Sequence, residues 1–444
     1  FLRYNTRSFT YQGRKAPSTK KDITMAINAP EGTRDLLPDE ALFWNQFKQT
    51  AAEVFGAYGY LPIETPIMEQ TELFVRGIGE ATDVVSKEMF TAISGENLRR
   101  WVEEGKAPKA KSRLSLRPEG TAGVVRAVVQ HDLVPQGAAP AKLMYAGPMF
   151  RAERPQKGRL REFVQCDIDI LGDSSPNAEV ELIDVTARAL LKIGFTGFTV
   201  NINDRRILRA MLEKMGFAAD QLDSVCISFD KMDKIGADGV KAELTEKGFA
   251  AEAVQALDDF LRAGDFSLDT VAARVDDEAL TADLRYVIAA SEKVAGGRYG
   301  IAYAPSLVRG QGYYTGMVFE VTCPQFSGAV AGGGRYDNMV GKFIGQQVPA
   351  VGFSIGFERV CGILLEQGYQ IPGAKPKMAL LYLKDADFAA VLAKAESLRA
   401  DYDVTVLPQA KKLGKQFGTL EAAGYNAVAF ADNDDVKLLG QKAE

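Results

Sequence analysis

The sequence predicts an α+β fold, in which a sheet-containing domain is interrupted by a helical insertion and followed by a small α/β domain. Three observations support this prediction. Strand-like sequence separates two amphipathic helices, residues 205–295 are helical and charged, and residues 378–444 alternate short apolar strands with helices. A chain of 444 residues is long enough for several domains of ordinary size.

Two helices frame the first strand-rich stretch. Pro38 opens the first helix, acidic residues occupy its first turn, and Gly56 and Gly59 end its run of apolar residues at helical spacing. The second helix begins after Pro176 and stops at Gly194, with apolar residues along one face.

Residues 163–170, between these helices, alternate as a strand does. One face is apolar, and the other carries Phe163, Gln165, Asp167 and Asp169. A solvated outer face is the usual explanation of such polarity, and a face that lines a ligand site is the alternative. The alternation alone leaves both explanations open.

The remaining elements follow in chain order. Strands are expected within 299–322, 326–331, 349–355, 378–383, 404–407 and 427–430, and helices at 357–365, 388–399 and 411–423. These elements predict a first sheet-containing part (25–204), the helical insertion (205–295), a second sheet-containing part (296–367), a linker (368–377) and a C-terminal α/β domain (378–444).

Residues 1–24 differ from the rest of the chain. They contain six Lys or Arg, one acidic residue and no helical or strand period. A disordered extension is favoured over an organelle transit peptide, and Met25 is a plausible initiator.

Composition excludes several classes of protein. The net charge of −5 argues against a wholly cationic nucleic-acid binder, although local basic patches remain compatible with RNA. No apolar run approaches the ~20 residues that span a bilayer. The four cysteines lie far apart without a C-x-x-C pair, which argues against zinc and disulfides and favours a reducing, cytoplasmic location.

Histidine occurs once in the chain, at His131, after apolar residues that read as the end of a helix. Metal sites and acid–base relays depend heavily on imidazole. We therefore expect chemistry that needs no histidine base.

Polar and glycine-rich residues gather in four segments. They are Leu114–Thr121, Phe150–Arg159, Leu307–Gly316 together with Gly332–Asp337, and Gly352–Arg359. Taken alone, Arg335 or Arg154 is expected to be a surface charge, and the glycines are expected to serve turns. Arg309, between an apolar residue and glycine, is harder to explain in that way.

At these segments the chain resembles class II aminoacyl-tRNA synthetases, and the histidine-specific family in particular. Phe150–Phe163 is similar to the second motif of the class, Gly356–Arg359 to its third, and Pro66 to the proline of its first. The segment Leu307–Gly316 is peculiar to the histidine enzymes, and residues 29–35 match their opening. Several motifs in the right order are stronger than one short pattern.

The resemblance implies a fold and an activity. The fold is a mixed, largely antiparallel sheet with helices, a helical insertion and a C-terminal domain like an anticodon-binding module. The activity is that of a histidine–tRNA ligase, with L-histidine, ATP and tRNA(His) as substrates, Mg²⁺ as companion of the phosphates, and a homodimer as the usual assembly.

The groups of histidine suggest which side chains bind it. Its ammonium calls for a fixed carboxylate, and Glu119 is the candidate, with Thr121 and Gln165 as hydrogen-bond partners. Its carboxylate needs a cation, which Arg309 fits. Its imidazole needs polar partners that reject isosteres, and these are Asp169, Tyr313, Tyr314 and Tyr336.

The nucleotide site follows from the resemblance. Arg151 is expected to grip the α-phosphate, and with Arg309 it is the candidate catalytic residue. Arg159 and Arg359 are expected to hold the phosphate tail, Phe163 to stack on adenine, and Glu153 to meet the adenine amino group.

Basic residues are the candidates for tRNA binding. Lys157 and Arg161 lie in or beside the loop of the second motif, which the family uses near the acceptor end. Lys411, Lys412 and Lys415 lie in the C-terminal domain, where a solvated helix face is an equally good explanation.

The chain departs from the family pattern in three places. Gln311-Gly312 replace the usual Leu-Asp, the position of Asp169 is often glutamate, and a final strand and helix are expected to be absent after Lys442. Two rival functions remain: a non-catalytic, synthetase-like regulatory subunit of ATP phosphoribosyltransferase, and a class II ligase for another amino acid. The Tyr-Tyr-Thr-Gly segment argues against the second.

Overall fold

The computed structural model describes residues 28–80, 82–107, 109, 113–133, 139–156, 158–229, 231–307, 313–369 and 375–440. The chain divides after Tyr369 into two compact units, which are considered separately below. The predicted extension 1–24 and residues 370–374 of the predicted linker lie outside the described residues.

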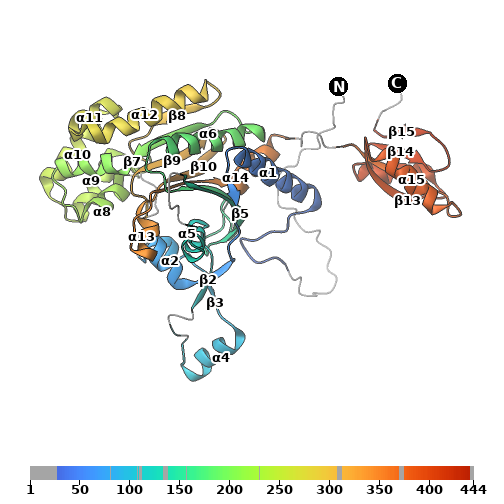
Figure 1. Cartoon of the computed structure of the whole chain (residues 1–444), viewed down its shortest axis with the longest axis horizontal. Coiled ribbons are helices and arrows are strands. Elements are labelled where there is room, and N and C mark those ends of the chain that lie inside the picture. Colours follow the sequence, from blue (N-terminus) through green and yellow to red (C-terminus); the bar gives the residue numbers. More distant parts are fainter. Residues whose placement is uncertain are drawn as a thin grey trace. The chain divides into compact units, whose positions relative to one another are not determined.

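The first unit is built on a mixed sheet that is largely antiparallel (Figure 1). Within the described residues its strands are ordered β1-β5-β6-β11-β10-β9-β7-β8. Only the edge pairs β1/β5 and β7/β8 of this sheet are parallel. The bounds are β1 Leu61–Pro62, β5 Ala141–Phe150, β6 Glu162–Leu171, β7 Thr199–Asp204, β8 Gly300–Tyr303, β9 Met317–Cys323, β10 Phe326–Arg335 and β11 Ala350–Gly356.

Helices α1 (Pro38–Ala57), α6 (Asn177–Lys192) and α14 (Phe357–Glu366) pack on the central strands of this sheet. The Phe47 ring of α1 stacks on Phe357 of α14, with 4.1 Å between ring centroids. Helices α2 (Thr71–Ile78), α5 (Thr121–Gln130) and α13 (Asn338–Ile344) pack on one another beside the sheet (Figure 1). His131 caps the C-terminal end of α5, as the sequence predicts.

Residues between β7 and β8 are helical throughout their described part. The helices are α7 (Arg205–Lys214), α8 (Leu222–Phe229), α9 (Met232–Glu246), α10 (Ala251–Ala263), α11 (Leu268–Val275) and α12 (Glu278–Ala295). This segment separates β7 from β8 in sequence, while the two strands pair side by side in the sheet. The exact boundary of the insertion stays a prediction.

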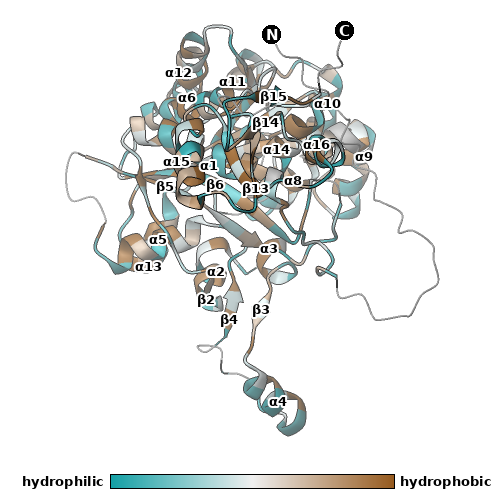
Figure 2. Cartoon of the chain, turned by 90° about the vertical axis from the view of Figure 1, so that its right-hand side faces the viewer, coloured by the Kyte–Doolittle hydropathy of each residue, from teal (hydrophilic) through white to brown (hydrophobic). Residues whose placement is uncertain are grey.

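A small antiparallel sheet, ordered β2-β4-β3 among the described residues, lies next to α2. Its strands are β2 Met68–Gln70, β3 Thr91–Ala92 and β4 Leu114–Leu116, with the short helix α3 (Asp83–Ser86) before β3. Helix α4 (Gly95–Glu104) connects β3 to β4 and projects away from the sheets, without a buried residue (Figure 2). The sequence did not lead us to expect α4.

The second unit has an α/β fold. Its described strands are ordered β13-β12-β14-β15 and are parallel except for β15. The elements are β12 Lys377–Tyr382, α15 Phe388–Leu398, β13 Asp403–Pro408, α16 Leu413–Ala422, β14 Ala427–Phe430 and β15 Val436–Leu438. All except β15 were predicted within a few residues. The fold-class prediction is confirmed in both units.

The helices of the described residues include none that is both long enough and apolar enough to cross a membrane. All four cysteines are buried and carry free thiols.

Gly333 offers a test of how tightly the central strands pack. A Cβ at this position would overlap the carbonyl group of Gly352 and lie 2.7 Å from the Cα of Phe353. We expect Gly333→Ala to lower the free energy of unfolding by about 1–3 kcal/mol, since neither neighbour is a flexible side chain. Thermal and denaturant unfolding of the full chain would measure this effect.

Gly362→Ala is the matched control, because a Cβ there meets no atom within 4 Å and the position is inside α14. Alanine is a better helix former, so this variant should gain up to about 1 kcal/mol. Equal stabilities of the two variants would contradict the packing argument.

Candidate active site

A cavity lies on the polar face of β6. Its lining comes from β6 and from three of the four polar segments, which are far apart in sequence, while Phe150–Arg159 contributes no lining residue. The lining residues are Glu119, Thr121, Gln165, Asp167, Asp169, Tyr313, Tyr314, Gly332, Gly333, Tyr336, Gly352, Phe353 and Ser354. All described members of the predicted histidine-binding set are among them.

The polar face of β6 is buried rather than solvated. Asp167 and Asp169 are 5% and 3% exposed. The solvated-face explanation of this alternation is therefore wrong, and the ligand-lining explanation fits the structure. Both faces of the strand are covered from Cys166 onwards.

Glycine on the neighbouring strands leaves room beside these carboxylates. Gly352 of β11 pairs with Asp169, and a Cβ on Gly352 would overlap the Asp169 carboxylate. Gln165 pairs with Gly147 on one side and Gly356 on the other. Here the glycines serve a close approach, which the sequence analysis had not distinguished from turns.

Glu119 stands at the start of α5, between β4 and the helix. Its two oxygens accept hydrogen bonds from the backbone N–H groups of Thr121 (2.8 Å) and Ala122 (2.9 Å). Burial raises the pKa of Glu119, and these hydrogen bonds oppose the shift. The helix N-terminus favours negative charge and so holds the carboxylate in place.

Asp169 and the tyrosines form the far part of the cavity. The Tyr336 hydroxyl donates a 2.5 Å hydrogen bond to Asp169 Oδ1, and the rings of Tyr313 and Tyr336 meet edge to face. Burial raises the pKa of Asp169 to about 7, although the bond from Tyr336 lowers it. This carboxyl group can therefore carry or lose a proton near neutral pH.

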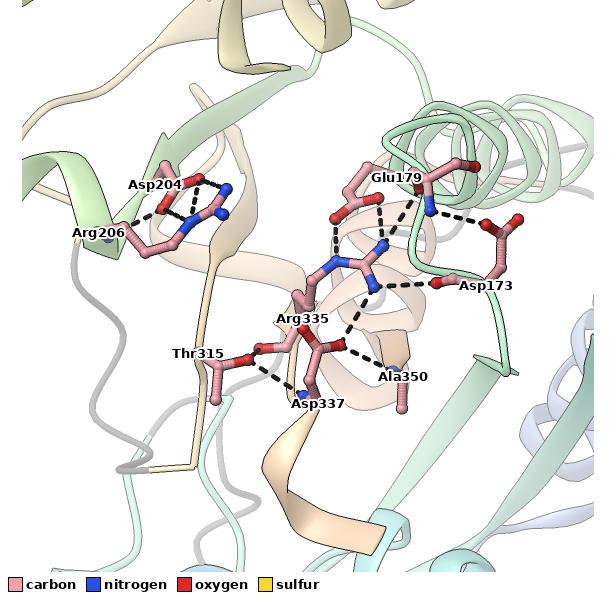
Figure 3. Close-up of polar contacts among 9 residues, drawn as sticks. Asp173, Glu179, Asp204, Arg206, Thr315, Arg335, Asp337 and Ala350 are labelled. Carbon is pink, nitrogen blue, oxygen red and sulfur yellow. Dashed lines mark hydrogen bonds and ion pairs between the residues drawn. The ribbon is translucent and has the colours of Figure 1, made fainter. Parts of the chain in front are cut away.

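Arg335 supports this part of the cavity from behind, and the expectation of a surface charge is wrong. It is 7% exposed, and its Nη2 lies 2.7 Å from Glu179 Oε2 of α6 (Figure 3). It also donates to the Asp173 carbonyl and to Asp337. These contacts fix the end of β10, where Tyr336 follows directly.

Asp337 and Thr315 complete the same network. Asp337 accepts from the backbone N–H of Ala350, and its own backbone N–H donates to the Thr315 hydroxyl (Figure 3). The Thr315 backbone N–H also donates to the Arg335 carbonyl group. The Tyr-Tyr-Thr segment, the end of β10 and the start of β11 are thus tied together. The tyrosines that line the cavity owe their positions to these bonds.

Arg151 follows β5 and lies near Glu119. Its Nε donates to the Pro118 carbonyl (2.8 Å), and its guanidinium lies 5.2 Å from the centroid of the Phe163 ring. Burial lowers the pKa of Arg151, and the nearby acids Glu88 and Glu119 oppose the shift. The side chain is a partly buried cation close to Glu119.

The loop after Arg151 holds several paired charges. Glu153 is buried and forms ion pairs with Arg159 and, at 3.7 Å, with Arg151. Arg161 donates to the Glu153 carbonyl group. Arg359 of α14 donates to the Gly158 carbonyl at 3.2 Å, so the third motif contacts the loop of the second.

Some predicted site residues are not placed by the structure. Arg309, Lys157 and Gln311-Gly312 lie outside the described residues. Lys411, Lys412 and Lys415 are exposed around the start of α16 in the second unit.

Two polar side chains of the cavity were missed as site residues by sequence reasoning. Asp167 was noticed only as part of the alternating face, and Ser354, its partner on β11, was quoted only within a motif. The alternation of β6 was the signal that could have identified Asp167, since its neighbours Gln165 and Asp169 were both selected.

The parts of the chain that the structure describes contain no cluster of three or more His, Cys, Asp or Glu arranged to hold a metal ion. Mg²⁺ on a nucleotide usually takes most of its ligands from phosphate and water.

Comparison with known proteins agrees with this geometry. The family model for histidyl-tRNA synthetase matches residues 32–360. A histidine–tRNA ligase of Leifsonia xyli is 37% identical over 428 residues, covering 92% of this chain and 96% of the relative. One of Microcystis aeruginosa is 34% identical and covers 89% and 87%.

Solved structures share the fold. The histidyl-tRNA synthetase of a Nostoc species superimposes with a TM-score of 0.75 at 24% identity, covering 93% of this chain and 95% of that one. A Bacillus halodurans protein, described as an ATP phosphoribosyltransferase regulatory subunit/histidyl-tRNA synthetase, gives 0.72 at 20% identity, covering 93% and 99%.

The largely antiparallel sheet is thus that of the class II aminoacyl-tRNA synthetases. Within this class, the match to the family model and the 37% identical relative show that the chain belongs to the histidyl-tRNA synthetase family.

The raised pKa of Asp169 predicts a pH-dependent stability. Between its ordinary pKa of 3.8 and about 7, the unfolded chain loses this proton while the folded chain keeps it. The contribution of this group to the free energy of unfolding therefore falls as pH rises through that range. Above it, the full cost of burying the ionised carboxylate is present. Asp169→Asn should gain stability over the wild type between pH 4 and 7, measured by denaturant unfolding.

Asp258→Asn in α10 is the control of opposite sign. Hydrogen bonds from Lys241 and Arg262 lower the pKa of Asp258, so its ionised form stabilises the fold. That variant should lose stability relative to the wild type as pH rises. For each variant, the difference in free energy of unfolding from the wild type is followed as a function of pH. If this difference changed in the same direction for both variants, the burial effect at Asp169 would be contradicted.

Proposed function

We propose that this chain is a histidine–tRNA ligase. It joins L-histidine to ATP to give histidyl-adenylate and pyrophosphate, and then transfers histidine to the 3′ end of tRNA(His). The observation that carries the proposal is one cavity in which buried acceptors from β6 and Glu119 lie close to the partly buried Arg151. Such a site offers separate partners to an amino acid and to a phosphate group.

Histidine binds at the acceptor side of the cavity. Glu119, with Thr121 and Gln165, receives the ammonium, and Arg309 holds the carboxylate. Asp169 meets the imidazole, with its orientation fixed by Tyr336. Tyr313 and Tyr314 close the cavity around the ring. An amino acid that lacks the imidazole N–H groups leaves these buried partners unpaired, and so binds weakly.

ATP binds at the guanidinium side. Arg151 grips the α-phosphate, Arg159 and Arg359 hold the phosphate tail, and Phe163 stacks on adenine beside Glu153. In the structure Arg151 lies over Phe163, and Arg159 pairs with Glu153. When the nucleotide binds, adenine replaces Arg151 on the Phe163 ring. The phosphate tail replaces Glu153 as the partner of Arg159.

The chemistry needs no protein nucleophile. A carboxylate oxygen of histidine attacks the α-phosphorus of ATP, and the bond to pyrophosphate breaks. The 3′-hydroxyl of tRNA then attacks the acyl carbon, its proton leaves, and AMP departs. Arg151 and Arg309 stabilise the charge that develops at the phosphorus and the carboxylate, so catalysis is mainly positioning and electrostatics. Mg²⁺ would screen the phosphates.

The proposal also covers the cellular location, the oligomeric state and the contacts with tRNA. The chain acts in the cytoplasm as a homodimer through the Pro66 segment. Arg161 and Lys157 contact the acceptor end of tRNA, and the lysines around the start of α16 contact it from the second unit. Backbone contacts of this kind position RNA without reading its bases.

A regulatory subunit is the second candidate, because a protein carrying that description shares the fold with a TM-score of 0.72. Histidine-dependent exchange of labelled pyrophosphate into ATP separates the two. We expect exchange with histidine and with no other proteinogenic amino acid. An absence of exchange across pH, metal and nucleotide conditions would overturn the ligase and favour the regulator.

Replacing Lys411, Lys412 and Lys415 by alanine tests the second unit. These exposed side chains lie outside the unit that holds the cavity, so exchange should keep its wild-type rate. Charging of tRNA(His) should weaken, with a smaller dependence on salt because fewer phosphates are neutralised. Measuring KM for tRNA at several salt concentrations checks this prediction, and unchanged values would make the lysines a solvated face only.

A further inference from the structure

The polar face of β6 carries one group that the proposed function leaves unused. Asp167 lies between Gln165 and Asp169 on this face, lines the same cavity and is almost fully buried. Burying a carboxylate costs free energy unless a partner compensates. A carboxylate at the centre of a binding cavity therefore calls for a partner that the ligand can supply.

Two oxygen atoms at this place lack hydrogen bonds within the described structure. They are Asp167 Oδ1 and Gln165 Oε1, and both are buried. The Gln165 amide donates through Nε2 to the Ser354 hydroxyl (3.1 Å), and that hydroxyl bonds to the Asp167 carboxyl group. This chain of bonds orients both side chains and leaves each with one acceptor atom to spare.

Glu119 lies beside these atoms. A Cβ at Gly120 would lie 2.9 Å from Asp167 Oδ2, so the Asp167 carboxyl group reaches the residue next to Glu119. The oxygens of Glu119 are bonded to the N-terminal amides of α5, but a carboxylate oxygen can accept more than one bond. The Thr121 hydroxyl also bonds to Glu119 and helps to orient it.

We propose that Asp167 is a further substrate-binding residue, whose free oxygen joins Glu119 and Gln165 Oε1 in receiving the α-ammonium of the amino acid. The inference rests on the proposed function, because the amino-acid substrate brings the ammonium. An ammonium has three donors and no acceptor, which matches three acceptors from two carboxylates and one amide. The second carboxylate selects a cationic amine over the isosteric hydroxyl, which would leave a buried charge unpaired.

The charges around Asp167 predict how its proton behaves. Facing it are Asp169 on β6, Glu119 before α5, Arg117 after β4, Tyr145 on β5 and Ser354 on β11. Burial raises the pKa of Asp167 well above its usual range, and Asp169 and Glu119 add to the shift, while Ser354 and Arg117 oppose it. These surroundings favour the protonated carboxyl group in the free protein, and an arriving ammonium favours the ionised form.

Asp167→Asn is the test, since it keeps the shape and removes the charge. In pyrophosphate exchange at pH 8, KM for histidine should rise roughly tenfold or more, the usual range for a lost charge-assisted bond, while KM for ATP stays within twofold. The penalty should shrink as pH falls, because the wild-type carboxyl group is then protonated as well. Asp258→Asn, which removes a buried carboxylate of α10 outside the cavity, should leave both KM values unchanged.

Calorimetric titration with histidine in buffers of different ionisation enthalpy gives a second measurement. Asp169, with a pKa of about 7, also titrates, so the difference in proton release between the wild type and Asp167→Asn reports on Asp167. The wild type should release more protons on binding histidine than the variant does. If Asp167→Asn does not fold, Asp167→Ser takes its place, and equal release by the wild type and the variant overturns the proposal.

The outcomes separate this inference from the function on which it rests. A wild-type protein without histidine-dependent exchange would end the ligase proposal. An active wild type whose Asp167→Asn variant keeps its KM for histidine would overturn only the role of Asp167. A fall in kcat with both KM values unchanged would make Asp167 a structural residue and would also overturn it.

Discussion

The pairing of β6 with β11 is the constraint on which the site depends. It sets Asp169 opposite Gly352, where a Cβ would overlap the Asp169 carboxylate. Gly333 on β10 approaches the Gly352 carbonyl group just as closely. The absence of side chains at these two positions lets the Asp169 carboxylate and the backbone of β10 and β11 pack closely along one side of the cavity.

Such a cavity needs support, because burial makes its carboxylates costly. The ion pair between Arg335 and Glu179 supplies part of it by tying the end of β10 to α6. A buried ion pair is weak evidence for stability, since desolvation offsets much of its attraction. Its geometry matters more here: the pair and Asp337 fix the peptide of Tyr336, and Tyr336 fixes Asp169.

Much of the fold could be predicted from the sequence where periodicity was strong. The strand predicted at 163–170 extends over Glu162–Leu171, and the helix predicted at 357–365 over Phe357–Glu366. Helix α4 was missed because its apolar stripe is short: Leu98, Trp101 and Val102 lie at helical spacing among charged residues, and none of them is buried. Strand β15 was missed because its three residues are exposed at an edge and too short to show alternation.

The residues of the candidate site could be predicted only in part. Motif resemblance selected Glu119, Gln165, Asp169 and Tyr336, and the structure brings them to one cavity. Alternation shows that one face of β6 is polar, but it does not show what covers that face. The sequence therefore could not decide between solvent and a ligand. The same gap explains why Arg335 read as a surface charge. Its partner Glu179 is far away in sequence, and only the packing of α6 brings the two together.

The shared fold of a ligase and a regulator makes charge, rather than architecture, the feature that divides them. A protein that only senses histidine needs the acceptor half of the cavity, which Glu119 and the face of β6 provide. It has no use for a partly buried guanidinium, whose desolvation must be offset. Arg151 lies partly buried between the Pro118 carbonyl group and the Phe163 ring, near Glu119. Keeping that cation beside the acceptors costs stability, and the proposed transfer of an adenylyl group to the amino acid gives a physical reason for the cost.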